Sequence, residues 1–435
     1  MAKEEELKFD TLKLRGGYDP AEHNNAVSVP IYQSTAFELE DTQRAARLFS
    51  FSEAAPLYTR IGNPTVTVLE NRVAALDGAA GAVALASGMA AISYTLFNVA
   101  GKGGRILSSV SLYGGTVDSF NKIYPEFGIG IDVVENPDDL QNFEKAITSD
   151  TRAVFIESIT NPNSTVSDIE GVAKIAHDHG IPLIVDNTLA TPYLFNPFRY
   201  GADVIVYSAT KSLTGHGNII AGLVLESGKF DWGNGKFPQF TTPHYVLRDT
   251  NGVERNFLEV FPEFPFTGRI RANYLNYLGA ALGPFDAYLA LLGLETLSER
   301  ISKQVSNTEK IIRYLESKDE VIWVKHPFAK GNPYKALADK YLPKGAGSVL
   351  TFGFKGSEEQ YDRFINSIRL FSYHANIGDS KSIIINSPKT THGELTPEQQ
   401  KQAGIFPETI RLSIGLEDPD DLIADLERAF GKAYQ

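Results

Sequence analysis

Short apolar runs alternate with helical patterns along the first half of the chain. Each run has the length and the aliphatic content of a buried strand. Between residues 169 and 176, apolar side chains recur at helical spacing, and Gly180 supplies a stop signal. Strands that alternate with helices predict βαβ units and a mainly parallel central sheet, and therefore an α/β fold. The predicted strands are residues 82–86, 105–109, 131–134, 153–156, 183–185 and 204–207.

The pattern changes on both sides of this region. Residues 1–57 are only weakly periodic, so we expect an arm rather than a packed unit. Residues 228–268 are rich in Phe, Pro and Gly and predict a long irregular excursion, which in a compact domain usually has a function or lies at an interface. We therefore expect an N-terminal arm over residues 1–60, a large domain over 61–285 and a smaller C-terminal domain over 286–435.

The C-terminal domain predicts a second α+β unit. A helical pattern over residues 288–315 comes first. The last helix begins at Asp418-Pro419, which is an N-cap followed by proline, and we expect Gly431 to end it. The other expected elements are strands near residues 348–354, 382–386 and 409–415 and a helix from about residue 358.

Composition narrows the possible functions. The 435 residues include 41 basic and 53 acidic side chains, a formal net charge of -12, so neither a nucleic acid nor an anionic membrane is expected as the main partner. The absence of cysteine excludes disulfides, thiolate catalysis and cysteine-ligated metals. His177 and His179 do not share a helix face, so we expect no metal site there. The N-terminus lacks a signal-peptide pattern and no apolar run reaches ~20 residues, which predicts a cytoplasmic protein.

Lys211 is the first candidate for chemistry. It follows the predicted strand 204–207, at the sheet edge where α/β proteins bind ligands, with Ser208 and Thr210 before it and glycines after it. An isolated lysine is more often a surface residue whose stem packs and whose amine reaches water. A buried lysine instead has a lowered pKa and becomes a nucleophilic amine, which a Schiff-base lysine requires.

Other positions fit a flat, phosphorylated cofactor. Asp186 ends the predicted strand 183–185 and can keep a pyridinium nitrogen protonated, although strand-end aspartates also cap helices. Gly88 and Met89 open a predicted helix whose free backbone amides can bind a phosphate. Tyr113 opens the next helix, where its ring could stack on the cofactor or simply pack in the core. Each feature is unspecific alone, and together they favour a pyridoxal-phosphate site.

The motifs around these residues occur in a fixed order, which is SGM, LYGGT, ESxxNP, VDNT, SATKSLTGHG and IRLSIG, and they span nearly the whole chain. This order resembles the Cys/Met-metabolism family of pyridoxal-phosphate enzymes. The resemblance implies pyridoxal 5'-phosphate as cofactor, the aspartate-aminotransferase-like architecture of fold type I with residues 61–285 as the cofactor-binding domain, and a homotetramer built from tight dimers. It also implies roles for single residues. Lys211 would form the Schiff base, Asp186 would pair with the pyridinium nitrogen, Tyr113 would stack on the ring, and Gly88, Met89, Ser208 and Thr210 would hold the phosphate.

Two further motifs imply contacts with the substrate and with a second subunit. Tyr58-Thr-Arg60-Ile-Gly-Asn-Pro-Thr matches the family's YSRxxNPT block, in which the Tyr and the Arg reach into the neighbouring subunit's site. Arg60 would hold the phosphate and Tyr58 would act as an activated phenol, although a surface ion pair is the alternative for the arginine. Arg411 matches the arginine that binds the substrate α-carboxylate, and Asn161 and Ser382 match positions that assist it.

Three features distinguish the branches of the family. NIGDSKS at residues 376–382 resembles the NxGDxKS block of O-acetylhomoserine sulfhydrylases, whereas cystathionine γ-synthases and lyases typically carry GGxES there. Lys381 in place of that glutamate disfavours cysteine or cystathionine as a substrate. The Phe-, Pro- and Gly-rich excursion also resembles the sulfhydrylase branch, and Gly115 stands where methionine γ-lyases usually have cysteine. Ser212 after the lysine and the NSPK segment that follows SIII depart from the family pattern.

The resemblance therefore implies a γ-replacement reaction. We expect O-acetyl-L-homoserine and sulfide, the small-molecule partners, to give L-homocysteine and acetate, with Lys211, Tyr58 and Tyr113 as catalytic residues. A γ-lyase or a cystathionine γ-synthase is the alternative within the family. A non-catalytic metabolite-binding protein is the alternative of another class, but such a protein has no need for the lysine or for a phenol from a second subunit.

Overall fold

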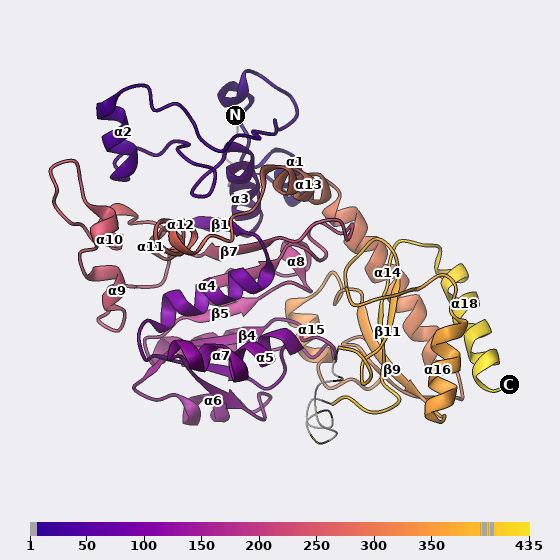
Figure 1. The fold of residues 1–435 in the computed structure, drawn as a ribbon. Coiled ribbons are helices and arrows are strands. Elements are labelled where there is room, and N and C mark those ends of the chain that lie inside the picture. The colour runs from indigo at the N-terminus through magenta and orange to yellow at the C-terminus, as the bar shows by residue number, and fades with distance from the viewer. Residues whose placement is uncertain (1–6, 392, 394–397, 399, 401–403) are drawn as a thin grey trace.

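Two β-sheets organise the chain, which the computed structural model describes at residues 7–391, 393, 398, 400 and 404–435 (Figure 1). The larger sheet consists of β1 (Gly81–Leu85), β2 (Arg105–Ser109), β3 (Gly130–Val134), β4 (Thr151–Glu157), β5 (Leu183–Asp186), β6 (Val204–Ser208) and β7 (Gly222–Glu226). Their order in the sheet is β1-β7-β6-β5-β4-β2-β3. The strands from β2 to β6 pair in parallel, and β7 runs antiparallel to β1 and to β6. The predicted α/β fold with a mainly parallel sheet is therefore confirmed.

The sequence analysis does not predict β7, whereas the other strands of the large sheet lie within a few residues of their predicted positions. The run Gly-Leu-Val-Leu-Glu of β7 is short and directly follows the glycine-containing segment around Lys211. Because β7 returns antiparallel beside β6, residues 209–221 form a loop at the carboxyl end of β6. This topology places Lys211 at the edge of the sheet.

Helices cover both faces of the large sheet (Figure 1). They are α3 (Pro64–Asp77), α4 (Gly88–Ala100), α5 (Gly114–Lys122), α6 (Leu140–Ala146), α7 (Ile169–Asp178), α8 (Thr191–Leu194) and α13 (Pro284–Glu295). In β5, Leu183 and Val185 join a core with α3, α7 and α13, whereas Ile184 joins a second core with α4. Successive side chains of a strand point to opposite faces, so one sheet builds two cores.

Shorter elements fill the connections. None of the helices in the described part of the chain combines the length and the apolar character that a membrane crossing needs. The segment between β7 and α13 carries α9 (Pro238–Thr241), α10 (Phe257–Val260), α11 (Pro265–Arg269) and α12 (Asn276–Leu278). Single helical turns lie at Pro20–His23, Tyr124–Phe127, Pro197–Tyr200 and Tyr245–Leu247, and a π-helical segment spans Ile270–Leu275.

The smaller sheet belongs to the C-terminal part of the chain. Its strands are β8 (Val321–Lys325), β9 (Val349–Phe354), β10 (Ser372–Tyr373), β11 (Ile383–Asn386) and β12 (Ile410–Ser413), in the order β10-β11-β12-β9-β8. A third core joins this sheet to α14 (Leu297–Glu316), α16 (Glu358–Ser367) and α18 (Pro419–Ala433), and α16 and α18 form its outer layer in Figure 1. A further helix, α15 (Lys335–Tyr341), precedes β9.

Two helix predictions need correction. The single helix expected over residues 288–315 is wrong, because α13 ends at Glu295 and α14 begins at Leu297. Thr296 between them leaves helical geometry, and its N–H bonds to Gly293 O instead of continuing the α-helical ladder. Gly431 does not end the last helix, since α18 continues to Ala433. Ala433 and Phe430 are buried, and their packing holds the final turn in place.

The N-terminal segment is more closely packed than we expected. In α1 (Phe9–Arg15), Leu12 belongs to the first core and Lys13 is only 2% exposed. The Lys13 amine lies 2.5 Å from Glu299 of α14, which ties α1 to the body of the protein. The expectation of an unpacked arm is therefore wrong at α1, whereas α2 (Thr42–Phe49) lies away from both sheets (Figure 1). The domain limits at residues 60 and 285 remain predictions.

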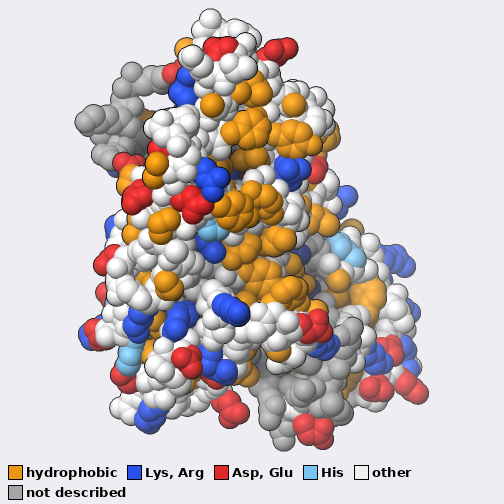
Figure 2. Space-filling model, turned by 60° about the vertical axis from the view of Figure 1, so that its left-hand side comes forward, with side chains coloured by type: hydrophobic (Ala, Val, Ile, Leu, Met, Phe, Trp, Pro, Cys, Tyr) orange, Lys and Arg blue, Asp and Glu red, His pale blue; other side chains and the backbone are white. Residues whose placement is uncertain are grey.

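Hydrophobic side chains gather on one face of the molecule (Figure 2). This face is the left-hand side of Figure 1, where α2, α9 and α10 lie. The segments on this side carry large apolar side chains that are well exposed in the single chain, among them Phe49, Tyr245 and Leu278. Extended apolar surface of this kind is typical of protein–protein contacts.

Glu226 fastens the excursion to the large sheet. At the end of β7 its carboxylate is 1% exposed and accepts four hydrogen bonds. Oε1 accepts from Trp232 Nε1 at 2.9 Å and from Phe266 N at 3.1 Å. Oε2 accepts from Thr267 N at 2.9 Å and from the Thr267 hydroxyl at 3.1 Å. Burial raises the pKa of Glu226 to about 7.

We predict that Glu226→Ala destabilises the protein by about 3 kcal/mol or more, because buried donors from three residues lose their acceptor. The urea midpoint can be followed by the fluorescence of Trp232, whose indole bonds to Glu226. The control is Glu263→Ala, which removes an exposed carboxylate from the same excursion and should change stability by less than about 0.5 kcal/mol. Equal midpoints for the two variants would contradict the role of Glu226.

Candidate active site

Lys211 lies between the two sheets. Its amine donates a hydrogen bond to Asn376 Oδ1 at 2.5 Å, across 165 positions of sequence. Burial lowers the pKa of Lys211, the nearby positive charge of Arg411 lowers it further, and the Asp379 carboxylate opposes both. A lowered pKa makes the lysine amine easier to deprotonate, and a neutral amine can act as a nucleophile and as a base.

The loop that carries Lys211 is clamped by a buried arginine. Arg300 donates to Ser212 O at 2.9 Å, to Leu213 O at 3.0 Å and to Gly293 O at 2.7 Å. Gly215, with φ of +72°, leaves space for this guanidinium, because a Cβ there would lie 2.0 Å from Arg300 NH1. The clamp fixes the backbone immediately after the lysine.

Two buried carboxylates end adjacent strands. Glu157 of β4 and Asp186 of β5 are register partners. Burial raises the pKa of both, and the charge of Asp186 raises the pKa of Glu157 further. Neighbouring carboxylates disfavour each other's charged form. Asp186 Oδ1 accepts a hydrogen bond from Thr188 N at 2.9 Å, which supports the charged form.

The N-terminus of α4 approaches β6 closely. Ser87 caps α4 by accepting a hydrogen bond from Ala90 N at 3.0 Å. A Cβ at Gly88 would lie 2.6 Å from Ser208 Cβ, so only glycine permits this approach. Thr210 is held near the same edge, since its hydroxyl accepts from Ala221 N at 3.0 Å. Met89 follows in the first turn of α4, partly buried against the second core.

Tyr113 presents its ring at the same edge of the sheet. Its backbone N–H donates to Glu157 Oε1 at 2.6 Å, while the side chain is 45% exposed. A Cβ at Gly115 would lie 2.6 Å from Tyr113 Cε1, so the ring lies directly over this glycine. A side chain at residue 115 would therefore require the Tyr113 ring to move.

Arg411 of β12 faces the lysine from the smaller sheet. It is 4% exposed, and its guanidinium donates at 3.1 Å to Asn161 Oδ1 and at 3.1 Å to Asn376 O. Both acceptors are neutral, and burial lowers the pKa of Arg411 to about 10. A buried guanidinium held by neutral oxygens is well suited to bind an anion.

Ser382 is placed differently from Asn161. Its hydroxyl donates to Glu417 Oε2 at 2.8 Å and accepts from Gly415 N at 2.8 Å, and the residue is fully buried. These bonds fasten the start of β11 and occupy the hydroxyl. The predicted contact of Ser382 with a substrate stays a prediction.

Tyr58 and Arg60 lie on the surface of the single chain. The guanidinium carbon of Arg60 is 4.9 Å from the centre of the Tyr58 ring, and Tyr58 is 37% exposed. Ala36 pairs with Tyr58 in an isolated β-bridge. In the single chain these two side chains therefore contact each other at the surface and do not line the buried site around Lys211.

Similar proteins were found for nearly the full length of the chain. A family model described as Cys/Met metabolism PLP-dependent enzyme matches residues 10–431. The chain belongs to this family. The O-acetyl-L-homoserine sulfhydrylase of Leptospira meyeri is 42% identical and covers 97% of this chain and 96% of its own length. This family membership makes pyridoxal phosphate the cofactor and the protein an enzyme.

Two solved structures have the same fold. A putative O-acetylhomoserine (thiol)-lyase from Campylobacter jejuni, which contains a pyridoxyl-lysine monophosphate, superposes with a TM-score of 0.93 at 40% identity and covers 98% of this chain and 100% of its own. The cystathionine γ-lyase of Lactobacillus plantarum, in complex with L-serine, gives a TM-score of 0.84 at 30% identity and covers 98% of this chain and 100% of its own. The fold of the pyridoxal-phosphate enzymes of this family, predicted from the motifs, is confirmed.

The residues of this family member fit the cofactor. A helix N-terminus opened by Gly88, a partly buried carboxylate at Asp186 and a partly buried lysine of lowered pKa meet at the carboxyl edge of one sheet. These are the groups that a phosphate, a pyridinium nitrogen and an aldehyde require.

Sequence reasoning missed Glu157 and Asn376 as site residues. Glu157 accepts from the N–H groups of Tyr113 and Asn161, the latter at 3.1 Å, and so positions both. Its place at a strand end, inside the ESxxNP motif, was a usable signal. Asn376 contacts both Lys211 and Arg411. The NIGDSKS motif marks this residue, but a local motif does not show a contact that depends on the approach of two sheets.

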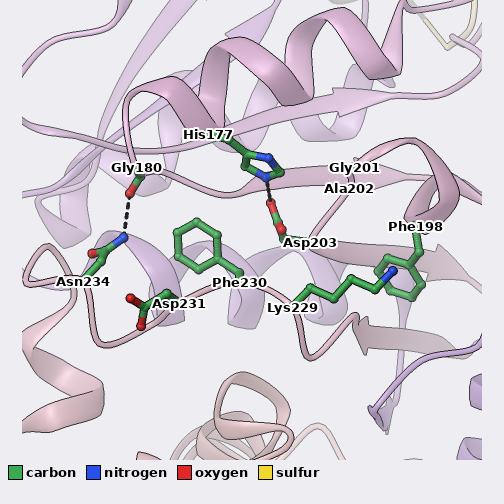
Figure 3. Close-up of a pocket in the computed structure, with 10 residues that line it drawn as sticks. All are labelled: His177, Gly180, Phe198, Gly201, Ala202, Asp203, Lys229, Phe230, Asp231 and Asn234. Atoms are coloured by element: carbon green, nitrogen blue, oxygen red, sulfur yellow. Dashed lines mark hydrogen bonds and ion pairs between the residues drawn. The ribbon is translucent and has the colours of Figure 1, made fainter.

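A separate cavity lies near the other end of the strands. It is lined by aromatic and charged side chains, including His177, Asp203, Phe230 and Asn234 (Figure 3). Asp203 precedes β6, whereas Lys211 follows it. The cavity is therefore at the amino edge of the sheet, away from the candidate active site.

Behind Asp186 lies a buried network that ends at Asp77. The Tyr207 hydroxyl donates to Asp77 Oδ2 at 2.9 Å and accepts from Asn187 Nδ2 at 3.0 Å. Burial raises the pKa of Asp77 to about 8. A carboxyl whose folded-state pKa is raised stabilises the protein at low pH, and this stabilisation is lost as the pH rises through the folded-state pKa.

We predict that Asp77→Asn removes this pH dependence. The free energy of unfolding of the unchanged protein should fall relative to that of the variant by about 1 kcal/mol or more between about pH 5 and pH 8. Urea midpoints of both proteins across this range measure the difference. Asp339→Asn, at an exposed partner of Lys335, is the control and should give a constant difference. A constant difference for Asp77→Asn would show that Asp77 is already ionised at about pH 5.

Proposed function

We propose that this enzyme catalyses γ-replacement, in which O-acetyl-L-homoserine and sulfide give L-homocysteine and acetate. The observation that carries the proposal is the pair of Lys211, which is partly buried, and Arg411, which is buried, both in contact with Asn376. This arrangement holds a nucleophilic amine beside a group that can bind a carboxylate. The name of the Leptospira meyeri relative supports the choice of substrate.

In this proposal the chain holds the cofactor at the carboxyl edge of the large sheet. The backbone amides of Gly88 and Met89 and the hydroxyls of Ser208 and Thr210 would bind the phosphate. Asp186 would keep the ring nitrogen protonated and Tyr113 would cover the ring. When bound, pyridoxal phosphate withdraws electrons from the carbon that carries the substrate amino group.

Arg411 and Lys211 would then act on the substrate itself. The Arg411 guanidinium binds the α-carboxylate, and Asn161 orients this guanidinium through the bond at 3.1 Å. The Lys211 amine takes the proton from Cα and returns a proton to the substrate later. In the overall exchange, the Cγ–O bond breaks with its electron pair leaving on acetate, and sulfide supplies the electron pair of the new Cγ–S bond.

The proposal favours replacement over elimination for reasons in the chain. Lys381 is exposed and offers no carboxylate to a second amino group of a substrate such as cystathionine. The Tyr113 ring lies over Gly115. This glycine stands where methionine γ-lyases usually have a cysteine. A γ-lyase is the second candidate, because one of the similar solved structures is a cystathionine γ-lyase.

We further propose a cytoplasmic homotetramer built as a dimer of dimers, which acts on small molecules. The exposed positions of Tyr58 and Arg60 and the hydrophobic face of Figure 2 support a partner subunit. In such an assembly, Arg60 would reach the phosphate of the neighbouring site and Tyr58 would act there as a phenol.

We predict that purified protein with pyridoxal phosphate forms homocysteine from O-acetylhomoserine only when sulfide is present. Lys211→Ala should lower this rate by a factor of about a thousand or more, because both the nucleophile and the base are lost. Lys303→Ala, at an exposed lysine of α14, is the matched control and should retain the rate. Formation of 2-oxobutyrate and ammonia regardless of sulfide would identify a γ-lyase instead.

The role of the second subunit can be tested by mixing inactive variants. We predict that Tyr58→Phe combined with Arg60→Ala, and Lys211→Ala, are each nearly inactive. Random reassembly of the two variants should restore about a quarter of the unmutated activity, because half of the dimers would contain one intact site of two. Activity of homocysteine formation after dissociation and reassembly is the measurement. No recovery, with confirmed mixed dimers, would place Tyr58 and Arg60 in the same site as their own Lys211.

A further inference from the structure

The side-chain amide of Asn376 links two charged groups. Its Oδ1 accepts the hydrogen bond from the Lys211 amine at 2.5 Å, and its Nδ2 donates to Asp379 Oδ1 at 2.9 Å. The backbone carbonyl of the same residue accepts from Arg411 at 3.1 Å. Asn376 therefore serves the lysine through its side chain and the arginine through its main chain.

The orientation of this amide matters for the lysine. The oxygen and the NH₂ group of an asparagine have nearly the same shape, so packing alone selects weakly between the two orientations. A carboxylate only accepts hydrogen bonds, so Asp379 binds the NH₂ end of Asn376. The oxygen end must then point toward Lys211, and the amine meets an acceptor and not a second donor.

Asp379 is itself held in place. It is 8% exposed, and its backbone carbonyl accepts from Gln304 Nε2 at 2.8 Å. A Cβ at Gly217, where φ is +62°, would lie 2.8 Å from Asp379 Oδ2, so this glycine makes room for the carboxylate. On the outer side, His374 Nε2 lies 3.6 Å from Asp379 Oδ2. The carboxylate thus has one well-defined position beside Asn376.

We infer that Asp379 is a positioning residue that fixes the Asn376 amide so that its oxygen receives the Lys211 amine whenever an incoming amine displaces Lys211 from the cofactor. The inference rests on the proposed role of Lys211. It adds that the displaced lysine donates a hydrogen bond to an Asn376 oxygen that is already oriented to accept it. This bond stabilises the displaced state and keeps the amine oriented for proton transfer.

The inference can be tested on the cofactor-loaded enzyme without the proposed substrates. Displacement of the lysine by glycine or by methylamine changes the absorbance of the cofactor, and the concentration for half-displacement is the readout. Asp379→Asn and Asn376→Ala should each raise this concentration about tenfold for both amines, because the freed lysine loses a hydrogen bond that involves a charged group. Asp339→Asn, at an exposed partner of Lys335, makes the same chemical change at the surface and should have no effect.

Two combined variants distinguish an effect on the orientation of the Asn376 amide from a nonspecific disturbance of the site. Asn376→Ala with Asp379→Asn should be no worse than Asn376→Ala alone, because Asp379 acts only through the amide. Asn376→Ser should require an amine concentration for half-displacement close to that of the unmutated enzyme, since a hydroxyl can rotate to accept in any orientation. For the same reason, Asp379→Asn should have no further effect when it is added to Asn376→Ser. If the variant with both Asn376→Ala and Asp379→Asn raised the concentration for half-displacement by the product of the two single effects, the inference would be overturned.

A comparison of the two amines distinguishes an effect of Asp379 through Lys211 from an effect through Arg411. Glycine has a carboxylate for Arg411 and methylamine has none, so a penalty confined to glycine would mean that Asp379 acts through Arg411 and would overturn the inference. An unchanged Asp379→Asn enzyme, or an unmutated enzyme that neither amine displaces, would overturn it as well. These experiments do not measure homocysteine formation. If the proposed reaction proved wrong, the displacement results would still decide whether Asp379 positions Asn376.

Discussion

The placement of two cationic side chains, the partly buried Lys211 and the buried Arg411, against one asparagine is the constraint on which the site depends. Each would ordinarily demand a carboxylate partner when removed from water. Here both donate to asparagine oxygens, and burial lowers the pKa of each. These neutral acceptors leave positive potential in the site, which the nearby Asp379 carboxylate opposes. That potential is available for the anionic groups of a cofactor and an amino-acid substrate.

The parallel sheet explains how opposite charge is kept apart from these cations. Glu157 and Asp186 end neighbouring strands of the large sheet, so their carboxylates lie side by side. Lys211 follows the next strand and is turned by its loop toward the smaller sheet, where Arg411 lies. A cofactor with a cationic nitrogen at one end and an aldehyde at the other matches this separation. The order of the strands in the sheet thus determines where the carboxylates and the lysine lie relative to one another.

Local sequence was enough for the features that sit on one strand end. Lys211 and Asp186 follow apolar runs, and the structure places both at the carboxyl edge of the predicted parallel sheet. Asn376 could not be found in this way, since its role depends on contact with a residue 165 positions away. The failures in the fold have the same origin. β7 is a strand because it pairs with β1 and β6, and the turn at Gly431 stays helical because its neighbours are buried.

The surface position of Tyr58 and Arg60 connects assembly with chemistry. The arginine lies against the tyrosine ring at 4.9 Å, which reduces the freedom of both side chains before any partner arrives. Ordering them in advance lowers the entropy that would otherwise be lost on reaching into a second site. An exposed position also avoids the cost of burying Arg60 next to Lys211 and Arg411 in the same chain. In the proposed dimer, a partner subunit would supply Arg60, so that no chain has to bury this guanidinium beside its own Lys211 and Arg411.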